Sequence, residues 1–362
     1  MRRKGLVSAA ALLLLAGCDS GFDPPSQVDS LRVLIVEPEP ASGTPGQSSL
    51  LTMVTADGTR AGDGSLRAPR PLQIAWFGAC HNPPSRQYYA CFPVLNAIAA
   101  RLSSKVVETP LSGVPKGIFG LGPSFELTLP EEILSSAPKT SADPVHYGVS
   151  YAFFAVCAGE LRSRPDLQDR VPLECIDPET GEALGHRDFV TGFTTLFSYE
   201  GDVPVNQSPA LTAVEFAGSE LPEPSMGCTE DADCADLAVE NSFDGGCERE
   251  SGRCLPRLDP CPEKGDCPSL SVLPQLERAS AEPLPGQNAN EVVWLSFYAT
   301  AGSFDPSTEL VNDRATGWID DHAAYYSPPR RAVGRVELWV TANDQRGGAD
   351  FRKFEILVRD RD

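Results

Sequence analysis

Short hydrophobic runs separated by clusters of Pro, Gly and Ser recur along most of this chain. The first group comprises the runs LRVLIVE (31–37), SLLTMVTA (49–56), LQIAWFGA (72–79), SFELTL (124–129), VSYAFFAVCAG (149–159) and FVTGFTTLFSY (189–199). The second group comprises ALTAVEFAG (210–218), SLSVLPQLE (269–277), EVVWLSFYAT (291–300), VGRVELWVTAND (333–344) and FRKFEILVRD (351–360). Runs of this length that are rich in β-branched and aromatic residues indicate strands. The pattern therefore predicts an all-β protein.

Two features refine this prediction. One run alternates with a period of two, which places Val149, Tyr151, Phe153, Ala155 and Cys157 on one buried strand face. The segment PVLNAIAARL (93–102) instead has helical spacing, and it predicts one surface helix with the apolar face Val94, Leu95, Ile98 and Leu102.

The strand groups indicate two tandem Ig-like β-sandwich domains, because many short strands with turn signals between them are typical of sandwiches. We place the first domain at residues 30–200, with Trp76 as its expected core tryptophan. The polar segment GDVPVNQSP (201–209) is the expected linker, and residues 210–362 form the second domain. A Cys-rich insert (residues 227–268) interrupts the second domain.

The N-terminus has the layout of a secretory signal, with the basic segment MRRK followed by an apolar run from Leu6 to Ala16. This run is too short to span a bilayer, which takes about 20 residues. Its end, Leu-Ala-Gly-Cys at 15–18, resembles the lipobox of bacterial lipoproteins. The resemblance implies removal of residues 1–17, lipidation of Cys18 and a tether over 18–29. The alternative is an ordinary secretory signal with a chance cysteine.

The other ten cysteines are expected to form disulfides, because an even number behind a secretory signal indicates an oxidising compartment. We expect the local pairs Cys80–Cys91 and Cys157–Cys175. Three further disulfides are expected within the insert, among Cys228, Cys234, Cys247, Cys254, Cys261 and Cys267. These six permit 15 connectivities, which the sequence does not resolve. The insert has few apolar residues, so we also expect the second sandwich to fold without it.

The formal net charge of −20 falls to −23 when the three cations of the signal segment are removed. Such an acidic chain is not expected to bind nucleic acid, which requires cationic groups against the phosphates. The insert contains 11 acidic and 4 basic residues. Asp231, Asp233 and Asp236 are therefore candidate Ca²⁺ ligands, although their spacing is not that of an EF-hand. The alternative is a solvated acidic loop, and no other cofactor is expected.

Catalytic motifs are scarce in the sequence. Neither G-x-S-x-G nor H-E-x-x-H occurs. The triplet Asp320-Asp321-His322 is a candidate for a hydrolytic or metal site, and turn-forming aspartates beside an exposed histidine are the alternative. We therefore predict a protein that is not an enzyme, with a secreted hydrolase or a Ca²⁺-dependent surface enzyme as the alternative.

Two tyrosine pairs are candidate recognition residues. Tyr88-Tyr89 precedes a cysteine, and Tyr325-Tyr326 precedes the sequence PPRR (328–331). Exposed tyrosine beside arginine is typical of binding surfaces. Because adjacent strand residues point to opposite faces, one tyrosine of each pair is alternatively a core residue.

The second domain resembles the Ig-like and PKD-like sandwiches of bacterial surface proteins. The resemblance is carried by Trp294 in a central strand and by TANDQRGG (341–348) as a final hairpin, although no WDFGDG follows Trp294. It implies an envelope lipoprotein of unknown activity. We therefore expect a lipid-anchored binding, adhesion or structural module in the inner or outer membrane, facing the periplasm or the cell surface. Its expected partner is an envelope protein or a glycan.

Overall fold

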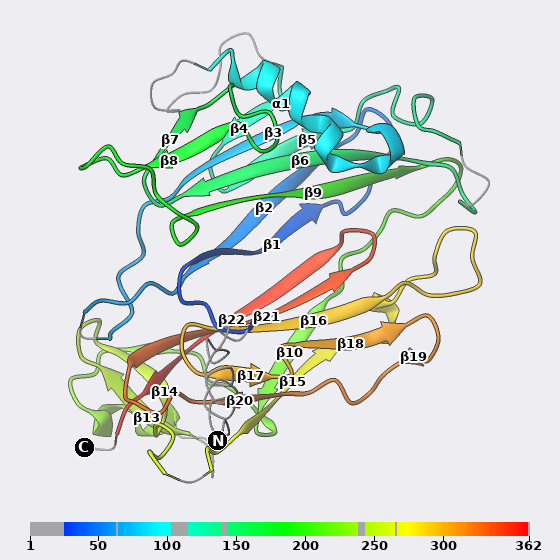
Figure 1. The fold of residues 1–362 in the computed structure, drawn as a ribbon. Coiled ribbons are helices and arrows are strands. Elements are labelled where there is room, and N and C mark those ends of the chain that lie inside the picture. Colours follow the sequence, from blue (N-terminus) through cyan, green and yellow to red (C-terminus); the bar gives the residue numbers. More distant parts are fainter. Residues whose placement is uncertain are drawn as a thin grey trace, which may run out of the picture.

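The computed structural model describes residues 25–62, 64–102, 115–139, 143–237, 243–264 and 266–360. The predicted signal segment and Cys18 lie outside these residues. The described chain forms two β-sandwiches, one above the other in Figure 1. The predicted all-β fold is therefore confirmed. None of the helices in the described segments is long and apolar enough to cross a membrane.

The first sandwich consists of two sheets and a small hairpin. The smaller sheet has the order β1-β2-β5, with β1 (Leu31–Glu39), β2 (Ser48–Asp57) and β5 (Ser124–Thr128). The larger sheet has the order β4-β3-β6-β9, with β3 (Gln73–His81), β4 (Phe119–Leu121), β6 (Tyr147–Cys157) and β9 (Phe189–Tyr199). Strands β7 (Glu160–Ser163) and β8 (Leu173–Ile176) form the hairpin. Strand β9 is thus an edge strand.

Strand β6 lies at the centre of the first sandwich, and its residues 148–157 are all buried. The face predicted from the alternation (Val149, Tyr151, Phe153, Ala155 and Cys157) packs in one core with the buried side of the helix. The opposite face packs in a second core around Trp76. The Trp76 ring is fully buried and stacks on Phe125, with 5.7 Å between ring centroids. The larger sheet is therefore covered on both faces.

The predicted helix is observed as α1 (Phe92–Ala99), which follows the short 3-10 turns η1 (Pro84–Arg86) and η2 (Tyr88–Cys91). Leu95, Ile98 and Leu102 are buried as expected. Val94 is 40 % exposed and was wrongly assigned to the buried face, because the helix rotates it toward solvent. The disulfides Cys80–Cys91 and Cys157–Cys175 form as predicted.

The second sandwich has a five-stranded sheet and a larger sheet. The five-stranded sheet has the order β11-β10-β15-β20-β17, with β10 (Leu211–Phe216), β11 (Ser219–Glu220), β15 (Leu270–Leu276), β17 (Ser303–Asp305) and β20 (Ala324–Ser327). The larger sheet has the order β12-β14-β22-β21-β16-β18-β19, with β13 also paired to β14. Its strands are β12 (Ser225–Met226), β13 (Asp244–Glu248), β14 (Arg253–Leu258), β16 (Val293–Ala299), β18 (Thr308–Asp313), β19 (Gly317–Trp318), β21 (Gly334–Asp344) and β22 (Ala349–Val358). Turns η3 (Asp231–Leu237) and η4 (Arg278–Ser280) complete this half.

The Cys-rich insert packs against the second sandwich, so we now expect the sandwich to depend on it, in contrast to the prediction from the sequence. Its disulfides are Cys228–Cys247, Cys234–Cys254 and Cys261–Cys267, all internal to the insert. Its strand β14, however, pairs in parallel with β22. Phe243 and Leu258 are buried in the main core of the sandwich. The sequence suggested autonomy because these few apolar residues are scattered among acidic ones.

Part of the predicted tether is also folded. The Val28 amide donates to the carbonyl of Ala299 at 2.7 Å, and the Ala299 amide donates to that of Ser26 at 2.8 Å. The side chain of Val28 is fully buried against Ala56 of β2 and Trp339 of β21. Residues 25–29 therefore join the two sandwiches, because this short segment can bury its valine between them.

We expect Leu258→Ala to lower the free energy of unfolding by about 2–3 kcal/mol, because it leaves a cavity in a packed core. Leu310→Ala is the matched control, because Leu310 is 40 % exposed while Leu258 is 8 % exposed. Chemical denaturation of both variants measures the difference. Equal stabilities would show that the insert does not support the sandwich.

Strand β1 of the first sandwich contacts β22 of the second, and this contact brings Glu37 near Asp350 and Arg352. The titration of Glu37 predicts that stability depends on pH. Burial raises the pKa of Glu37 from its ordinary 4.5 to about 7. The nearby Asp350 carboxylate also raises this pKa, whereas Arg352 lowers it. The folded protein therefore holds this proton more tightly than the unfolded chain does. The resulting stabilisation is full below pH 4.5 and is lost as the pH rises through about 7.

We expect Glu37→Gln to be more stable than the wild type at pH 8 by about 1 kcal/mol, after allowance for solvent screening of a half-exposed group. At pH values below 4.5 the two proteins should be equally stable. Thermal unfolding across this range measures the effect, with the exposed Glu39→Gln as control. Parallel profiles for wild type and Glu37→Gln would contradict the assignment.

Candidate binding site at the edge of the first sandwich

Three exposed aromatic side chains gather beside the edge strand of the first sandwich. Tyr88 and Tyr89 come from η2, and Phe193 comes from β9; they are 44 %, 53 % and 41 % exposed. The rings of Tyr88 and Phe193 stack with 4.9 Å between centroids, and the Tyr89 ring meets that of Tyr88 edge-on at 5.9 Å. We call these three residues the aromatic surface. The sequence indicated the tyrosines, whereas Phe193 joins them only in the folded protein.

The segment that carries the tyrosines is firmly held. The Cys80–Cys91 disulfide ties η2 to β3. Asn82 accepts a hydrogen bond from the Val149 amide at 2.9 Å. Arg86 pairs with Asp143 at 2.6 Å and lies over the ring of Tyr147, 4.1 Å from its centroid. The tyrosines are therefore presented on a fixed support, which lowers the entropy that binding costs.

A cleft of about 480 Å³ begins at Phe193 and runs between the two sandwiches. It is lined by residues 33–36 of β1, Phe154 of β6, residues 190, 191 and 193–195 of β9, and residues 343–345 and 347–349 at the tip of the β21–β22 hairpin, with Trp294 on one side. Figure 1 shows this hairpin reaching from the lower sandwich toward β1 and β9. We call this space the interdomain cleft.

Backbone hydrogen bonds join the first sheet to the second on either side of the cleft. The Leu31 amide donates to the carbonyl of Arg187, and the Gly43 amide donates to that of Phe197, each at 3.0 Å. Between these contacts the two strands belong to different sheets. The middle of β9 therefore lines the cleft instead of pairing with β1.

The hairpin tip is shaped by hydrogen bonds to Asp344. The Asp344 carboxylate accepts the amides of Arg346 and Gly348, each at 2.8 Å, and the side-chain amide of Asn206 at 2.9 Å. Gly347 has a φ of 95°, and a Cβ there would lie 3.1 Å from the carbonyl oxygen of Thr195. Glycine thus permits the close approach of the hairpin to β9.

A buried ion pair anchors the same hairpin. Arg346 is 4 % exposed and its Nε lies 2.7 Å from a carboxylate oxygen of Glu291, which is fully buried; Glu282 also pairs with Arg346. Burial, the largest cause, raises the pKa of Glu291 to about 6 against the opposing effect of Arg346. Burial also raises the pKa of Asp344, against its hydrogen bonds.

The lining of the interdomain cleft is almost free of charge. Asp344 is its one charged residue, and its oxygens already accept the hydrogen bonds of the turn. The other polar side chains are hydroxyls and amides, namely Thr191, Thr194, Thr195, Asn343 and Gln345. Together with Trp294 and Phe193 they provide neutral hydrogen-bonding groups beside aromatic rings.

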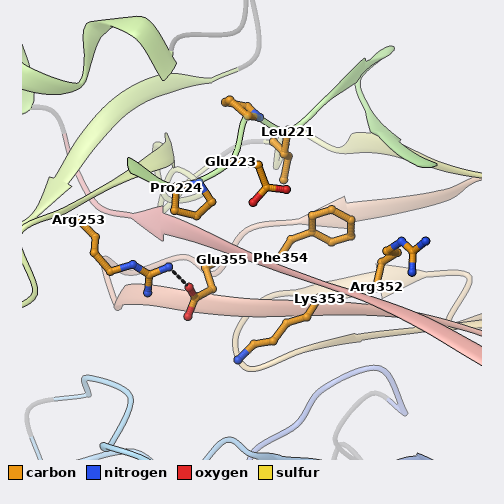
Figure 2. Close-up of a pocket in the computed structure, with 9 residues that line it drawn as sticks. Leu221, Glu223, Pro224, Arg253, Arg352, Lys353, Phe354 and Glu355 are labelled. Carbon is orange, nitrogen blue, oxygen red and sulfur yellow. Dashed lines mark hydrogen bonds and ion pairs between the residues drawn. The ribbon is translucent and has the colours of Figure 1, made fainter. Parts of the chain in front are cut away.

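A smaller pocket of about 300 Å³ lies between residues 221–224 and β22 (Figure 2). Its basic residues and Glu355 are already paired. Arg253 forms an ion pair with Glu355 across the pocket, and Lys353 pairs with Glu337 at 2.9 Å. This pocket is therefore a weaker candidate than the interdomain cleft.

The structure separates the tyrosines of the second predicted pair. Tyr325 is 49 % exposed, whereas Tyr326 is fully buried and donates to the carbonyl of Ala301 at 2.9 Å. Burial raises the pKa of Tyr326 well above its ordinary value. Tyr326 is thus a core residue, as the alternation of strand faces allowed.

In the triplet Asp320-Asp321-His322, the candidate hydrolytic site, His322 and Asp320 make contacts within the protein. Both ring nitrogens of His322 lie 2.9 Å from backbone carbonyl oxygens, those of Ile319 and Pro274. Asp320 is exposed and pairs with Arg278 at 2.8 Å. His322 is buried, which corrects the expectation of an exposed histidine. Its nitrogens face acceptors, so they do not face a substrate or a metal.

Two of the three candidate Ca²⁺ ligands have protein partners. Asp231 pairs with Arg257 at 2.8 Å and with Arg359. One oxygen of Asp233 accepts three hydrogen bonds from residues 229 and 230, which lowers the pKa of Asp233. Asp236 is exposed on η3. The sulfur atoms of Cys228, Cys234 and Cys247 lie within 4.8 Å of one another, and they belong to disulfides.

The sequence matches no protein-family model and no curated protein. Among solved structures, it is similar to fibronectin(III)-like modules of Clostridium thermocellum CbhA, with 8 % identity over 90 % of this chain and 94 % of that chain and a TM-score of 0.19. It is also similar to the adhesin InvE of Yersinia pseudotuberculosis, with 10 % identity over 91 % of this chain and 60 % of that chain and a TM-score of 0.15. Dimeric latent PorU from Porphyromonas gingivalis has 10 % identity over 91 % of this chain and 24 % of that chain, with a TM-score of 0.19. Because these scores are low, the assignment to β-sandwiches rests on the sheets themselves.

Proposed function

We propose that this protein is a lipid-anchored binding protein of the bacterial cell envelope, with Ig-like and PKD-like domains, that holds a neutral glycan at the edge of its first sandwich. The lipobox-like sequence at 15–18 supports the anchor. The five disulfides support an extracellular or envelope location, since disulfides persist in oxidising compartments. The protein acts by binding and not by catalysis.

The observation that carries the glycan proposal is the continuity of the aromatic surface with the neutral interdomain cleft through Phe193. Exposed aromatic groups on a rigid support mark interaction sites. Sugar rings present apolar C–H faces to aromatic rings and hydroxyls to polar groups. The threonines and amides of the cleft offer such partners without the desolvation cost of an unpaired charge.

The binding proposal predicts the effect of removing the exposed rings. We expect Tyr89→Ala combined with Phe193→Ala to weaken glycan binding at least about tenfold, because each aromatic contact is worth about 0.5–1.5 kcal/mol. Titration calorimetry of the mature protein in neutral detergent, with a panel of neutral chito-, cello- and manno-oligosaccharides, measures the affinity.

The control for this test is Leu310→Ala, which removes a similarly exposed apolar side chain from the second sandwich. Circular dichroism establishes that all variants are folded. Failure of the wild type to bind any oligosaccharide of the panel would refute the glycan proposal, as would equal affinities for the wild type and the double variant.

The lipid anchor has its own test. The intact mass of the membrane-extracted protein should lack residues 1–17 and include a diacylglycerol and an acyl chain, such as palmitate, on Cys18. Two or more acyl chains give stable membrane attachment, whereas one gives marginal binding. Cys18→Ser should remove the added mass, while Ser20→Ala should leave it. A Cys18→Ser protein that is still acylated would overturn the assignment.

A further inference from the structure

A separate pocket gathers arginines where the two sandwiches meet the Cys-rich insert. Arg60 comes from the segment between β2 and β3, while Arg330 and Arg331 follow β20. The pocket has a volume of about 630 Å³. Its remaining lining residues are all uncharged and include Ser303 and Ser327. We call it the arginine pocket; its lining combines three cations with no acidic residue, in a chain whose net charge is −20.

Two of the three arginines, Arg60 and Arg330, donate hydrogen bonds to backbone oxygens. Arg60 donates to the carbonyls of Gly64 and Thr300, each at 2.7 Å, and Arg330 donates to that of Pro262 at 2.8 Å. Within the described residues, no ion pair joins Arg60, Arg330 or Arg331 to a carboxylate. Neutral carbonyls orient a guanidinium group but leave its positive charge uncompensated. Burial accordingly lowers the pKa of Arg60.

Three contacts hold the walls of the arginine pocket in place. The bond from Arg60 to Thr300 joins the first sandwich to the second. The disulfide Cys261–Cys267 closes the wall that the insert provides, and the Cys261 amide donates to the carbonyl of Pro329 at 2.9 Å. The guanidinium groups of Arg60 and Arg330 are therefore positioned before a ligand arrives, which favours binding.

We propose that the arginine pocket binds a phosphate group. The planar fork of arginine matches phosphate oxygens in a bidentate manner, and the hydroxyls of Ser303 and Ser327 supply neutral donors beside it. The ligand is a soluble phosphate ester or the phosphate of a phospholipid headgroup. This site is independent of the glycan site, and only its lipid source depends on the proposed anchor.

The lipid source is favoured by the position of Gln27, which lines the pocket. It stands nine residues after Cys18, the proposed lipidation site. A fully extended chain spans about 3.3–3.6 Å per residue, so this segment reaches at most about 32 Å. The arginine pocket therefore lies within reach of the headgroups of the membrane that holds the anchor.

The test is phosphorus NMR of glycerol phosphate titrated with the mature protein in neutral detergent. We expect saturable line broadening that weakens with added salt, because salt screens charges. The double variant Arg330→Gln/Arg331→Gln should weaken binding at least about tenfold. The control, Arg170→Gln/Arg278→Gln, removes the same charge from two exposed arginines outside the pocket.

The single variant Arg331→Gln tests the pocket without a folding defect, because it keeps the hydrogen bonds that Arg330 donates to the insert. We expect this variant to bind glycerol phosphate about fivefold more weakly while it melts like the wild type. No binding by the wild type would overturn the proposal. Equal weakening by the pocket variant and the control variant would also overturn it, because the effect would then reflect net charge alone.

Vesicles of phosphatidylglycerol distinguish the two sources of phosphate. If they displace glycerol phosphate from the wild type and not from the pocket variant, the headgroup is the ligand. If glycerol phosphate binds and vesicles do not displace it, the ligand is a soluble phosphate ester. Both results support a phosphate site, and neither depends on whether the protein binds a glycan.

Discussion

The arrangement of this protein depends on the buried ion pair between Arg346 and Glu291. A buried arginine is costly unless a carboxylate meets it with good geometry, and loss of one partner typically costs about 3–5 kcal/mol. Here the pair fixes the tip of the β21–β22 hairpin, and Asp344 links that tip through Asn206 to the first sandwich. The two sandwiches are thus joined through the hydrogen bonds of Asn206 and through the apolar contact of Val28 and Trp339.

Both proposed sites follow from this junction of the two sandwiches, and their chemistry differs. The interdomain cleft combines β1 and β9 with a hairpin of the second sandwich, and its polar groups are neutral. The arginine pocket combines Arg60 of the first sandwich with Arg330 and Arg331 of the second, and its lining is cationic. A neutral site suits a ligand that is recognised by stacking and hydroxyl contacts. A cationic site suits an anion, which the acidic surface elsewhere would repel.

The candidate site was only partly predictable from the sequence. Tyr88 and Tyr89 were identified because adjacent tyrosines before a cysteine are conspicuous, and they are exposed. Phe193 was missed as a site residue because it belongs to an alternating strand that resembles any core strand. It is exposed only because β9 is an edge strand. His322 and Asp231 were singled out for their chemistry, but their partners come from distant segments.

The sequence by itself determined the long strands, the helix, the core position of Trp76 and the local disulfides of the first sandwich. These features depend on the alternation of apolar residues and on cysteines close together in the chain, both of which are local properties. Only the tertiary structure decided that the insert extends the sheet through β14, that residues 25–29 lie between the sandwiches, and that Arg60 meets the distant pair Arg330 and Arg331. The reason is that strand pairing and the burial of isolated apolar or charged groups depend on partners far along the chain, which no local pattern specifies.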